Sequence, residues 1–428
     1  MYDVICIGGG LNYAAAVILA KAGKKVALIE KNLNHIGGTC LHNGCIPSKN
    51  LLHRAKIALE SKEEVFSHKA KVNFKKLVQK TSKNLEFRTE AILKQIKSSG
   101  VEIIEGEAKV TKDGIEVNGE VLTSTYTIIA TGSRPKVLNF NYDKKRIITS
   151  NEALTLEEIP KEISVYGSGA IGLEMASLFA SLGSKVNLIY RKDKVTKFHE
   201  KINENLEKQL REIGINLMPN TEIIDAKVEN NEVIIKTNKE EFKTQYLLLA
   251  LGREPNIELI QTDEIEVDKY IKVDDYFRTT KENIFAIGDV NGKVLLAHAA
   301  RAEALNVVDQ ILGKNERLDL NLIPKFIYTL PLGYATIGET TENLAVFKVA
   351  NLGISNSSYL DNLGIIVIYV DDDKFVKGAE IFAPNAEELI GIMATALAGE
   401  MDINTLKKAI FPHPTYSEMV DRVVRKVR

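Results

Sequence analysis

Two glycine-rich turns, each between a strand-like and a helix-like segment, constrain the fold of this sequence more than any other feature. The apolar residues Tyr2–Ile7 lead into Gly8-Gly9-Gly10, and Ile163–Tyr166 lead into an intact G-x-G-x-x-G at 167–172. After each turn a helical pattern ends at a glycine, and a second short strand follows. This order predicts two dinucleotide-binding βαβ units, because a glycine turn lets a pyrophosphate approach the helix N-terminus. The repeat therefore predicts an α/β protein with two Rossmann-like domains, although two unrelated nucleotide-binding domains would give the same pattern.

The first turn is one residue shorter than the second. From Gly8 to Glu30, at the end of the second strand, is 22 positions, whereas the interval from Gly167 to Tyr190 is 23. As a result, Tyr13 stands where the glycine pattern requires its third glycine. Glu30 is still placed to accept hydrogen bonds from a pair of ribose hydroxyls.

In the second unit the equivalent acid is absent. Tyr190 stands in its place, and basic residues follow it: Arg191, Lys192, Lys194 and Lys197. An acid at this point binds the 2′-hydroxyl of NAD, whereas arginine pairs with the 2′-phosphate of NADP. The segment therefore favours NADP(H), and the alternative is a solvated basic turn.

A pair of cysteines lies between the two units, in the segment 37–49. Cys40 and Cys45 are five positions apart, and a helix is expected over Lys49–Leu59. If Cys40 lies in the first turn of a helix, Cys45 falls little more than one turn further on, a spacing that can close a small disulfide ring. The helix dipole and Lys49 would then stabilise a thiolate. The alternatives are two buried cysteines or half a zinc site, but the only other cysteine is Cys6 and no histidine pair has finger spacing, so no metal site is predicted.

The segment 37–49 resembles the active-site segment of the pyridine nucleotide-disulfide oxidoreductases, which include dihydrolipoamide dehydrogenase, glutathione reductase and mercuric reductase. Leu41 and Ile46-Pro47-Ser48-Lys49 are most similar to dihydrolipoamide dehydrogenase, and the resemblance extends over nearly the whole chain. It implies an FAD-binding domain, an NAD(P)-binding domain and a C-terminal α+β dimerisation domain. The expected bounds are 1–145 with 271–319, then 146–270, then 320–428.

The resemblance also implies roles for individual residues. Cys45 would lie beside the flavin, and Cys40 would exchange with the substrate sulfur. Lys49 would pair with Glu174 near the flavin, and His413, oriented by Glu418, would serve the dithiol of the other subunit of a homodimer. The residues implied for FAD binding are Gly8, Gly10, Glu30, Lys49, Thr131, Gly132, Asp289 and Ala297. Those implied for NAD(P) binding are Gly167, Gly169, Gly172, Arg191, Lys192, Lys197 and Gly252.

The C-terminal region changes pattern after residue 320. Strands are expected over Tyr334–Ile337, Leu363–Val370 and Gly378–Phe382, followed by helices over Ala386–Ala398 and Ile403–Ala409. This resembles the dimerisation domain of the family. One departure is Leu332, which stands after Pro331 where the family commonly has glutamate.

The bulk properties restrict the partners. A net charge of −1 gives no reason to expect nucleic acid or an anionic membrane, and no run of about 18 apolar residues predicts a membrane span. Three cysteines indicate a reducing compartment, and a strand that starts at Tyr2 leaves no room for a signal peptide. A cytoplasmic protein is expected.

Together these features predict an FAD-dependent dithiol–disulfide oxidoreductase similar to dihydrolipoamide dehydrogenase. Electrons would pass between NAD(P)(H), FAD, the Cys40–Cys45 disulfide and a small dithiol or disulfide, or a lipoyl domain. One alternative is an NADPH-driven enzyme similar to glutathione reductase. Another is a flavin-bearing interaction subunit without turnover, which the short first turn and Leu332 would favour.

Overall fold

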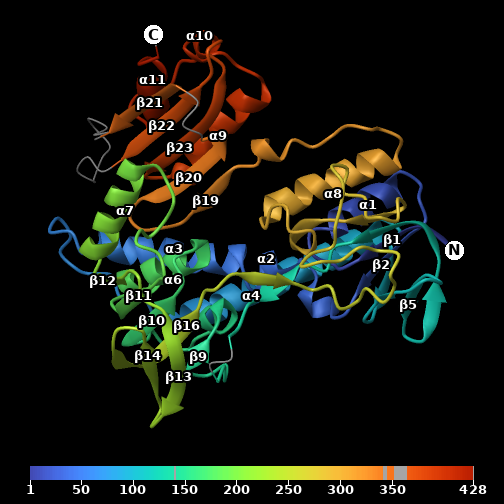
Figure 1. Cartoon of the computed structure of the whole chain (residues 1–428), viewed down its shortest axis with the longest axis horizontal. Coiled ribbons are helices and arrows are strands. Elements are labelled where there is room, and N and C mark those ends of the chain that lie inside the picture. The colour runs from blue at the N-terminus through green and yellow to red at the C-terminus, as the bar shows by residue number, and fades with distance from the viewer. Residues whose placement is uncertain (139–140, 341–344, 351–363, 428) are drawn as a thin grey trace. The chain divides into compact units, whose positions relative to one another are not determined.

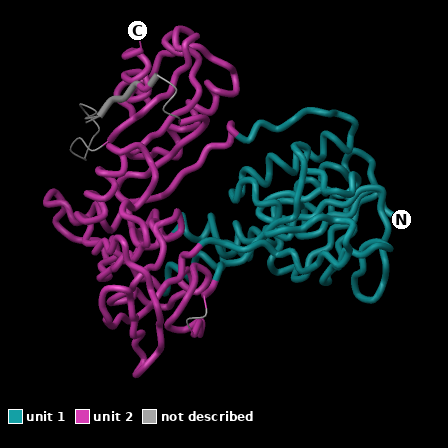
Figure 2. Tube along the Cα trace, in the orientation of Figure 1, with its two compact units in different colours: residues 1–50, 75–136, 252–320 teal, residues 51–74, 137–251, 321–428 magenta. Residues whose placement is uncertain are grey.

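The structure is a computed structural model, and it describes residues 1–138, 141–340, 345–350 and 364–427 (Figure 1). The chain divides into two compact units (Figure 2). The first comprises residues 1–50, 75–136 and 252–320, and the second comprises residues 51–74, 137–251 and 321–428.

The first unit is built on a five-stranded parallel sheet in the order β18-β7-β1-β2-β3. Its strands are β1 (Tyr2–Ile7), β2 (Val26–Glu30), β3 (Glu102–Glu105), β7 (Ser124–Ile129) and β18 (Ile284–Ala286). The last four residues of β1 are all buried, as expected for a central strand covered on both faces. Figure 1 shows helices α1 (Tyr13–Lys21) and α8 (Ala297–Ile311) side by side along this sheet.

Shorter elements complete the first unit. The helices are α2 (Gly38–His42), α3 (Cys45–Glu60, which continues into the second unit) and α4 (Phe74–Ser98), with 3₁₀ turns η1 (Leu33–His35), η2 (Gly288–Val290) and η3 (Leu320–Leu322, which also continues into the second unit). The small strands are β4 (Lys109–Val110), β5 (Ile115–Val117), β6 (Glu120–Leu122), β8 (Ser133–Pro135) and β17 (Arg253–Pro255). Between β5 and β6, Asn118 and Gly119 both have positive φ, as a tight hairpin turn requires.

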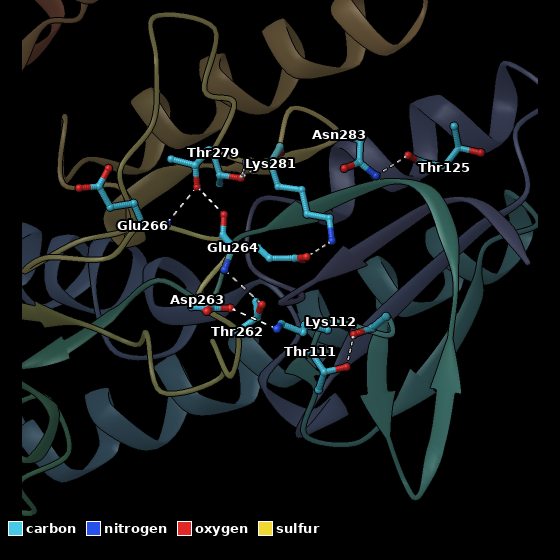
Figure 3. A network of polar contacts seen from close by, with 12 residues as sticks. Thr111, Lys112, Thr125, Thr262, Asp263, Glu264, Glu266, Thr279, Lys281 and Asn283 are labelled. Carbon is cyan, nitrogen blue, oxygen red and sulfur yellow. Dashed lines mark hydrogen bonds and ion pairs between the residues drawn. The ribbon is translucent and has the colours of Figure 1, made fainter.

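Polar contacts hold the segment 262–283 to its surroundings in this unit (Figure 3). Lys281 Nζ lies 2.5 Å from Glu264 Oε2, and Lys112 lies 3.8 Å from Asp263. Asn283 donates to the Thr125 carbonyl over 3.1 Å. Exposed ion pairs of this kind each contribute little to the stability of the unit, about 0–1 kcal/mol.

The second unit contains a second parallel sheet, in the order β12-β11-β10-β16-β9. Its strands are β9 (Ile147–Ile148), β10 (Glu162–Tyr166), β11 (Lys185–Ile189), β12 (Ile215–Met218) and β16 (Tyr246–Leu249). The helices are α5 (Ser150–Ala153), α6 (Ala170–Ser181) and α7 (Glu200–Glu212), and an antiparallel sheet is formed by β13 (Ile223–Glu229), β14 (Glu232–Thr237) and β15 (Glu241–Thr244).

The two parallel sheets are built in the same way around their first glycines. Gly8 has a φ of +96°, and a Cβ there would lie 2.4 Å from the Ala130 carbonyl oxygen. Gly167 has a φ of +117°, and a Cβ there would lie 2.3 Å from the Ala250 carbonyl oxygen. The Gly8 N–H donates to the Ile29 carbonyl near the end of β2, and the Gly167 N–H donates to the Ile189 carbonyl at the end of β11, both over 2.9 Å. The predicted repeat of two Rossmann-like units is therefore confirmed in three dimensions.

The C-terminal part of the second unit is an antiparallel sheet in the order β19-β20-β23-β22-β21. Its elements are β19 (Lys325–Ile327), β20 (Gly333–Gly338), β21 (Ala345–Ala350), β22 (Ile365–Val370), β23 (Val376–Ala383), α9 (Ala386–Ala398), α10 (Ile403–Leu406) and α11 (Glu418–Val424). Helices α9 and α11 pack on this sheet around a core that includes Ile368, Ile381 and Met393. The predicted α+β architecture is confirmed, with α10 shorter than expected and β22 starting at Ile365; Leu363 lies outside the described residues.

One local prediction was wrong. Cys40 and Cys45 do not lie in a single helical run, because α2 ends at His42 and α3 begins at Cys45. The helix expected to begin at Lys49 therefore begins four residues earlier. Gly37 and Gly38, with φ of +93° and +65°, turn the chain into α2.

Candidate active site

Cys40 and Cys45 meet across the break between α2 and α3. The two side chains are half-buried thiols that form no disulfide, and a hydrogen bond joins them. Gly44 permits this approach, because a Cβ there would lie 2.8 Å from the Thr39 carbonyl oxygen and 3.4 Å from Cys40 Cα. The first turn of α3 is set by Ser48, which donates to the Gly44 carbonyl through its N–H and to the Cys45 carbonyl through its Oγ. A glycine between two short helices thus brings two sulfurs together.

The surroundings oppose ionisation of the Cys40 thiol. The hydrogen bond with Cys45, burial and the charge of a Cys45 thiolate raise the pKa of the Cys40 thiol, while Lys49 opposes the shift. The Cys40 proton therefore needs a base to leave. Among the residues that the structure describes, no group of three or more His, Cys, Asp or Glu side chains could hold a metal ion.

The first glycine turn leaves room for a dinucleotide. A Cβ on Gly10 would meet only Gly38 Cα, at 3.9 Å, among the described atoms, and Gly37 N–H donates to the Gly9 carbonyl over 2.8 Å. Glu30 accepts from Gly9 N–H over 2.7 Å and from Asn32 N–H over 3.2 Å. The backbone is therefore open on the side where a pyrophosphate would approach, and the residues present fit a bound FAD.

Asn12, which sequence reasoning did not single out, takes the place of the third glycine in this turn. It lies 18 positions before Glu30, as Gly172 lies 18 positions before Tyr190. Its side chain is 1% exposed, and neither its Nδ2 nor its Oδ1 has a hydrogen-bond partner in the described part of the chain. Helix α1 begins at Tyr13, so this tyrosine is a helix residue and does not belong to the turn.

Ser133, Arg253 and Asp289 form a polar cluster at the end of the first sheet. Ser133 Oγ donates to Asp289 Oδ2 over 2.5 Å, and Arg253 Nε donates to Ser133 Oγ over 2.7 Å. Thr131 is held nearby, because it and Asn256 exchange side chain-to-carbonyl hydrogen bonds of 2.7 and 2.8 Å. Sequence reasoning identified Asp289 and Thr131 but missed Ser133 and Arg253. The signal was the echo of Gly132-Ser133 in Gly252-Arg253, whose strands β8 and β17 pair.

Behind Asp289, the fully buried Glu303 of α8 supports the turn η2. Its Oε2 accepts from Gly288 N–H over 2.7 Å and from Asn291 Nδ2 over 2.9 Å. Burial raises the pKa of Glu303 to about 7 from an ordinary 4.5; Asp289 adds to the shift, and Lys293 opposes it. Sequence reasoning missed this residue because a glutamate on a helix carries no sign of its burial.

The raised pKa of Glu303 predicts a pH dependence of stability. A folded carboxyl with pKa about 7 holds its proton more tightly than the unfolded one, so its contribution is complete below about pH 4.5 and is lost as the pH rises to about 7. The loss is on the order of 3 kcal/mol. We expect the unfolding temperature of Glu303→Gln to rise relative to wild type between pH 5 and pH 8, measured by calorimetry. The exposed Glu282→Gln is the control, and parallel curves for Glu303→Gln and wild type would contradict this account.

The second glycine turn and the basic residues lie in the second unit. No described atom would lie within 4 Å of a Cβ on Gly169 or Gly252, so both positions have room for a ligand. Arg191, Lys192 and Lys197 are exposed, and Arg191 lies 3.7 Å from Glu222. The residues that follow the position of the expected acid therefore present cations to solvent.

His413 and Glu418 form the predicted pair at the start of α11. The imidazole Nδ1 lies 2.9 Å from Glu418 Oε1, while Glu418 Oε2 accepts from Thr415 N–H over 3.0 Å. The hydrogen bond with His413 lowers the pKa of Glu418. Glu418 therefore orients the exposed imidazole ring through Nδ1 and is itself held by the backbone.

Lys49 and Glu174 belong to different units. Lys49 lies in the first turns of α3, and Glu174 is buried on α6, where its Oε1 accepts from Tyr328 N–H over 3.1 Å. The predicted pair of these two residues stays a prediction.

Comparison with known proteins decides the family. Residues 2–304 match the family described as pyridine nucleotide-disulphide oxidoreductase, and residues 323–424 match the dimerisation domain of the same family. The chain belongs to this family. It is 32% identical to a dihydrolipoyl dehydrogenase of Mycoplasma genitalium, over 99% of this chain and 98% of that protein. It is also 32% identical to a leghemoglobin reductase of Vigna unguiculata, over 98% of this chain and 86% of that protein.

A solved structure has the same fold. The HOCl-induced flavoprotein disulfide reductase RclA from Escherichia coli, solved as a Cu(II) complex, matches with a TM-score of 0.90 and 25% identity, over 100% of this chain and 99% of that chain. The predicted family, fold class and enzyme class are confirmed, and FAD and NAD(P) are the cofactors that the family implies. No helix among the described residues is long and apolar enough to cross a membrane.

Proposed function

We propose that this flavoenzyme exchanges electrons with a small dithiol or disulfide, or with a lipoyl domain, through a disulfide between Cys40 and Cys45. The observation that carries the proposal is the contact of the two thiols across Gly44, where a larger residue would not fit. The dihydrolipoyl dehydrogenases among the relatives support the lipoyl substrate.

The chemistry of the chain's own residues follows from their environment. Cys40 attacks one sulfur of a disulfide substrate as a thiolate, and the released thiolate takes a proton from His413. Cys45 then attacks the Cys40 sulfur, the second substrate thiol leaves, and the Cys40–Cys45 disulfide forms as the substrate gains two electrons. Glu418 holds the His413 tautomer, and Lys49 stabilises negative charge at the sulfurs. Bound FAD would supply the two electrons that reopen this disulfide, taken from the reduced nicotinamide.

The remaining assignments are part of this proposal. FAD is held by Gly8, Gly10, Glu30, Lys49, Thr131, Gly132, Asp289 and Ala297. The nicotinamide coenzyme is held by Gly167, Gly169, Gly172, Arg191, Lys192, Lys197 and Gly252. The FAD-binding domain comprises 1–145 with 271–319, the coenzyme domain 146–270 and the dimerisation domain 320–428. The protein is a homodimer in which His413 serves the dithiol of the partner, and Lys49 pairs with Glu174.

The coenzyme is NADP(H) in this proposal. Tyr190 replaces the acid that would bind a 2′-hydroxyl, and exposed cations follow it. The same observation favours a second candidate function, an NADPH-driven reductase similar to glutathione reductase.

One set of assays separates these functions. We expect turnover of lipoamide with NADP(H) to exceed turnover with NAD(H) by about tenfold or more, because a paired 2′-phosphate adds a charge-assisted contact. The measurement is kcat/KM for each coenzyme with lipoamide and with oxidised glutathione. Faster turnover of oxidised glutathione would favour the second function, and equal use of NADH would reject the coenzyme assignment. No thiol-dependent turnover at all would point to an interaction subunit.

A further inference from the structure

We infer that Asn203 of α7 is a specificity-determining positioning residue, which fixes the chain segment that distinguishes NADP(H) from NAD(H). The segment is residues 190–199, between β11 and α7, and is called the basic loop here. The inference rests on the proposed function, in which this loop faces the adenosine end of the coenzyme.

Two buried residues at the centre of the basic loop are fastened to α7. Thr196 donates to Asn203 Oδ1 through its N–H over 3.0 Å and through its Oγ1 over 2.8 Å. Asn203 Nδ2 donates to Glu207 Oε1 over 3.1 Å, and Val195 N–H donates to the same oxygen over 3.2 Å. Asn203 is 5% exposed and Thr196 is 9% exposed, so water competes little for these bonds.

The loop is fastened on its other side to the glycine turn. Ser168, between Gly167 and Gly169, donates through Oγ to the Val195 carbonyl over 2.7 Å. The N–H groups of Val195 and Thr196 are therefore bonded to α7, and the Val195 carbonyl is bonded to the turn proposed to bind the pyrophosphate. The loop and the pyrophosphate site thus share one rigid frame.

Helix α7 is itself fixed, so it can serve as that frame. At its N-terminus, His199 N–H donates to the buried Glu380 Oε1 over 3.3 Å, and the Phe198 ring stacks on Tyr334 at 3.5 Å. Near its C-terminus, Gln209 accepts from Leu332 N–H over 3.0 Å and donates to the Leu332 carbonyl over 3.1 Å. The N-terminal end of α7 is therefore held by the C-terminal sheet, and its C-terminal part is held by the connection between strands β19 and β20 of that sheet.

The backbone of the loop must be held by other residues, because the contacts of its cationic side chains are too weak to hold it. Arg191 and Lys194 have side chains 70% and 54% exposed, and their ion pairs with Glu222 and Glu200 are 3.7 Å long. Exposed pairs of this length restrain a side chain little. A phosphate binds tightly only if the cations are placed before it arrives, since ordering them on binding costs affinity. Tyr190, buried with an unpartnered hydroxyl among the described residues, offers the ribose no acid.

The test is the binding of NADP⁺ and NAD⁺ to the oxidised, FAD-loaded enzyme, measured by calorimetry. In Asn203→Ala, Thr196 loses its acceptor, and we expect the Kd for NADP⁺ to rise about tenfold or more while the Kd for NAD⁺ changes less than about threefold. Asn216→Ala is the matched control, because Asn216 donates a similar 3.0 Å side-chain bond to Asn187 away from the loop. The control is expected to leave the ratio of the two Kd values unchanged.

A paired exchange tests the geometry even if Asn203→Ala folds poorly. In Asn203→Asp/Glu207→Gln the carboxylate can accept both from Thr196 and from the new amide, while Val195 N–H loses its acceptor, because one Glu207 oxygen serves both bonds in the wild type. We expect this double variant to recover part of the wild-type ratio, whereas Asn203→Asp alone places two carboxylates together and does not. A ratio that stays at the wild-type value in Asn203→Ala, or an equal loss for both coenzymes, overturns the inference. A wild-type ratio that does not favour NADP⁺ instead rejects the coenzyme proposal, and the change of ratio between variants still decides the role of Asn203.

Discussion

Cys40→Ser and Cys45→Ser are each expected to lower NADP(H)-dependent turnover of lipoamide by about 10³-fold or more. Both sulfurs are needed to form the disulfide that carries the electron pair, and a serine oxygen cannot exchange with sulfur. Steady-state assays of the FAD-loaded enzyme measure the loss. Anaerobic addition of the reduced coenzyme, followed by thiol counting, is expected to release two further thiols in wild type and none in either variant.

Visible absorbance distinguishes the two cysteines. If Cys45 is the sulfur beside the flavin, a long-wavelength band depends on its thiolate, so the band is lost in Cys45→Ser and kept in Cys40→Ser. Cys6→Ala is the control, because Cys6 is fully buried in β1, and burial raises the pKa of its thiol to about 12. It should retain full turnover. Normal turnover in Cys40→Ser would remove the disulfide from the mechanism.

The second large effect separates two glycines of one turn. Gly172→Ala places a Cβ 1.8 Å from the Gly167 carbonyl oxygen, a backbone atom that cannot rotate away. We expect little folded protein or a sharply lower unfolding temperature. Gly169→Ala meets no described atom within 4 Å and has an ordinary φ of −75°, so its unfolding temperature should match wild type.

Coenzyme binding should reveal the defect of Gly169→Ala, the variant that is expected to fold normally. The methyl group of Gly169→Ala occupies the space through which the pyrophosphate approaches, so NADP⁺ and NAD⁺ should both bind about tenfold or more weakly. Gly391→Ala, on α9, also has no contact within 4 Å in the described structure and serves as the control for both measurements. Unchanged binding by Gly169→Ala would mean that the coenzyme does not lie on this turn.

The sequence was most informative where local pattern and fold requirements coincide. The first strand of each parallel sheet and the glycine turn after it could be predicted, because a buried strand followed by a glycine of positive φ has few other uses. The break between α2 and α3 could not, since it depends on the contact of Gly44 with Thr39 and Cys40 in three dimensions.

The residues that were missed act through partners distant in the sequence. Glu303 supports a turn fifteen positions away, and Ser133 and Arg253 meet 120 positions apart. Asn203 and Gln209 look like ordinary polar residues of an amphipathic helix, and only the structure shows that each is buried and holds a backbone segment. The spacing of residues along the chain predicts local chemistry, but it does not predict the contacts between distant residues that support a site.

The short first glycine turn has a consequence for how this sequence could have changed. The first turn is one residue shorter than the second and carries a buried side chain at Asn12. The equivalent position of the second turn, Gly172, has no space for a methyl group. Adding the residue back alone would leave the asparagine in the ordinary geometry, and substituting glycine alone would leave the chain too short. The two differences should therefore be coupled, so that reversing either one alone lowers stability more than reversing both together.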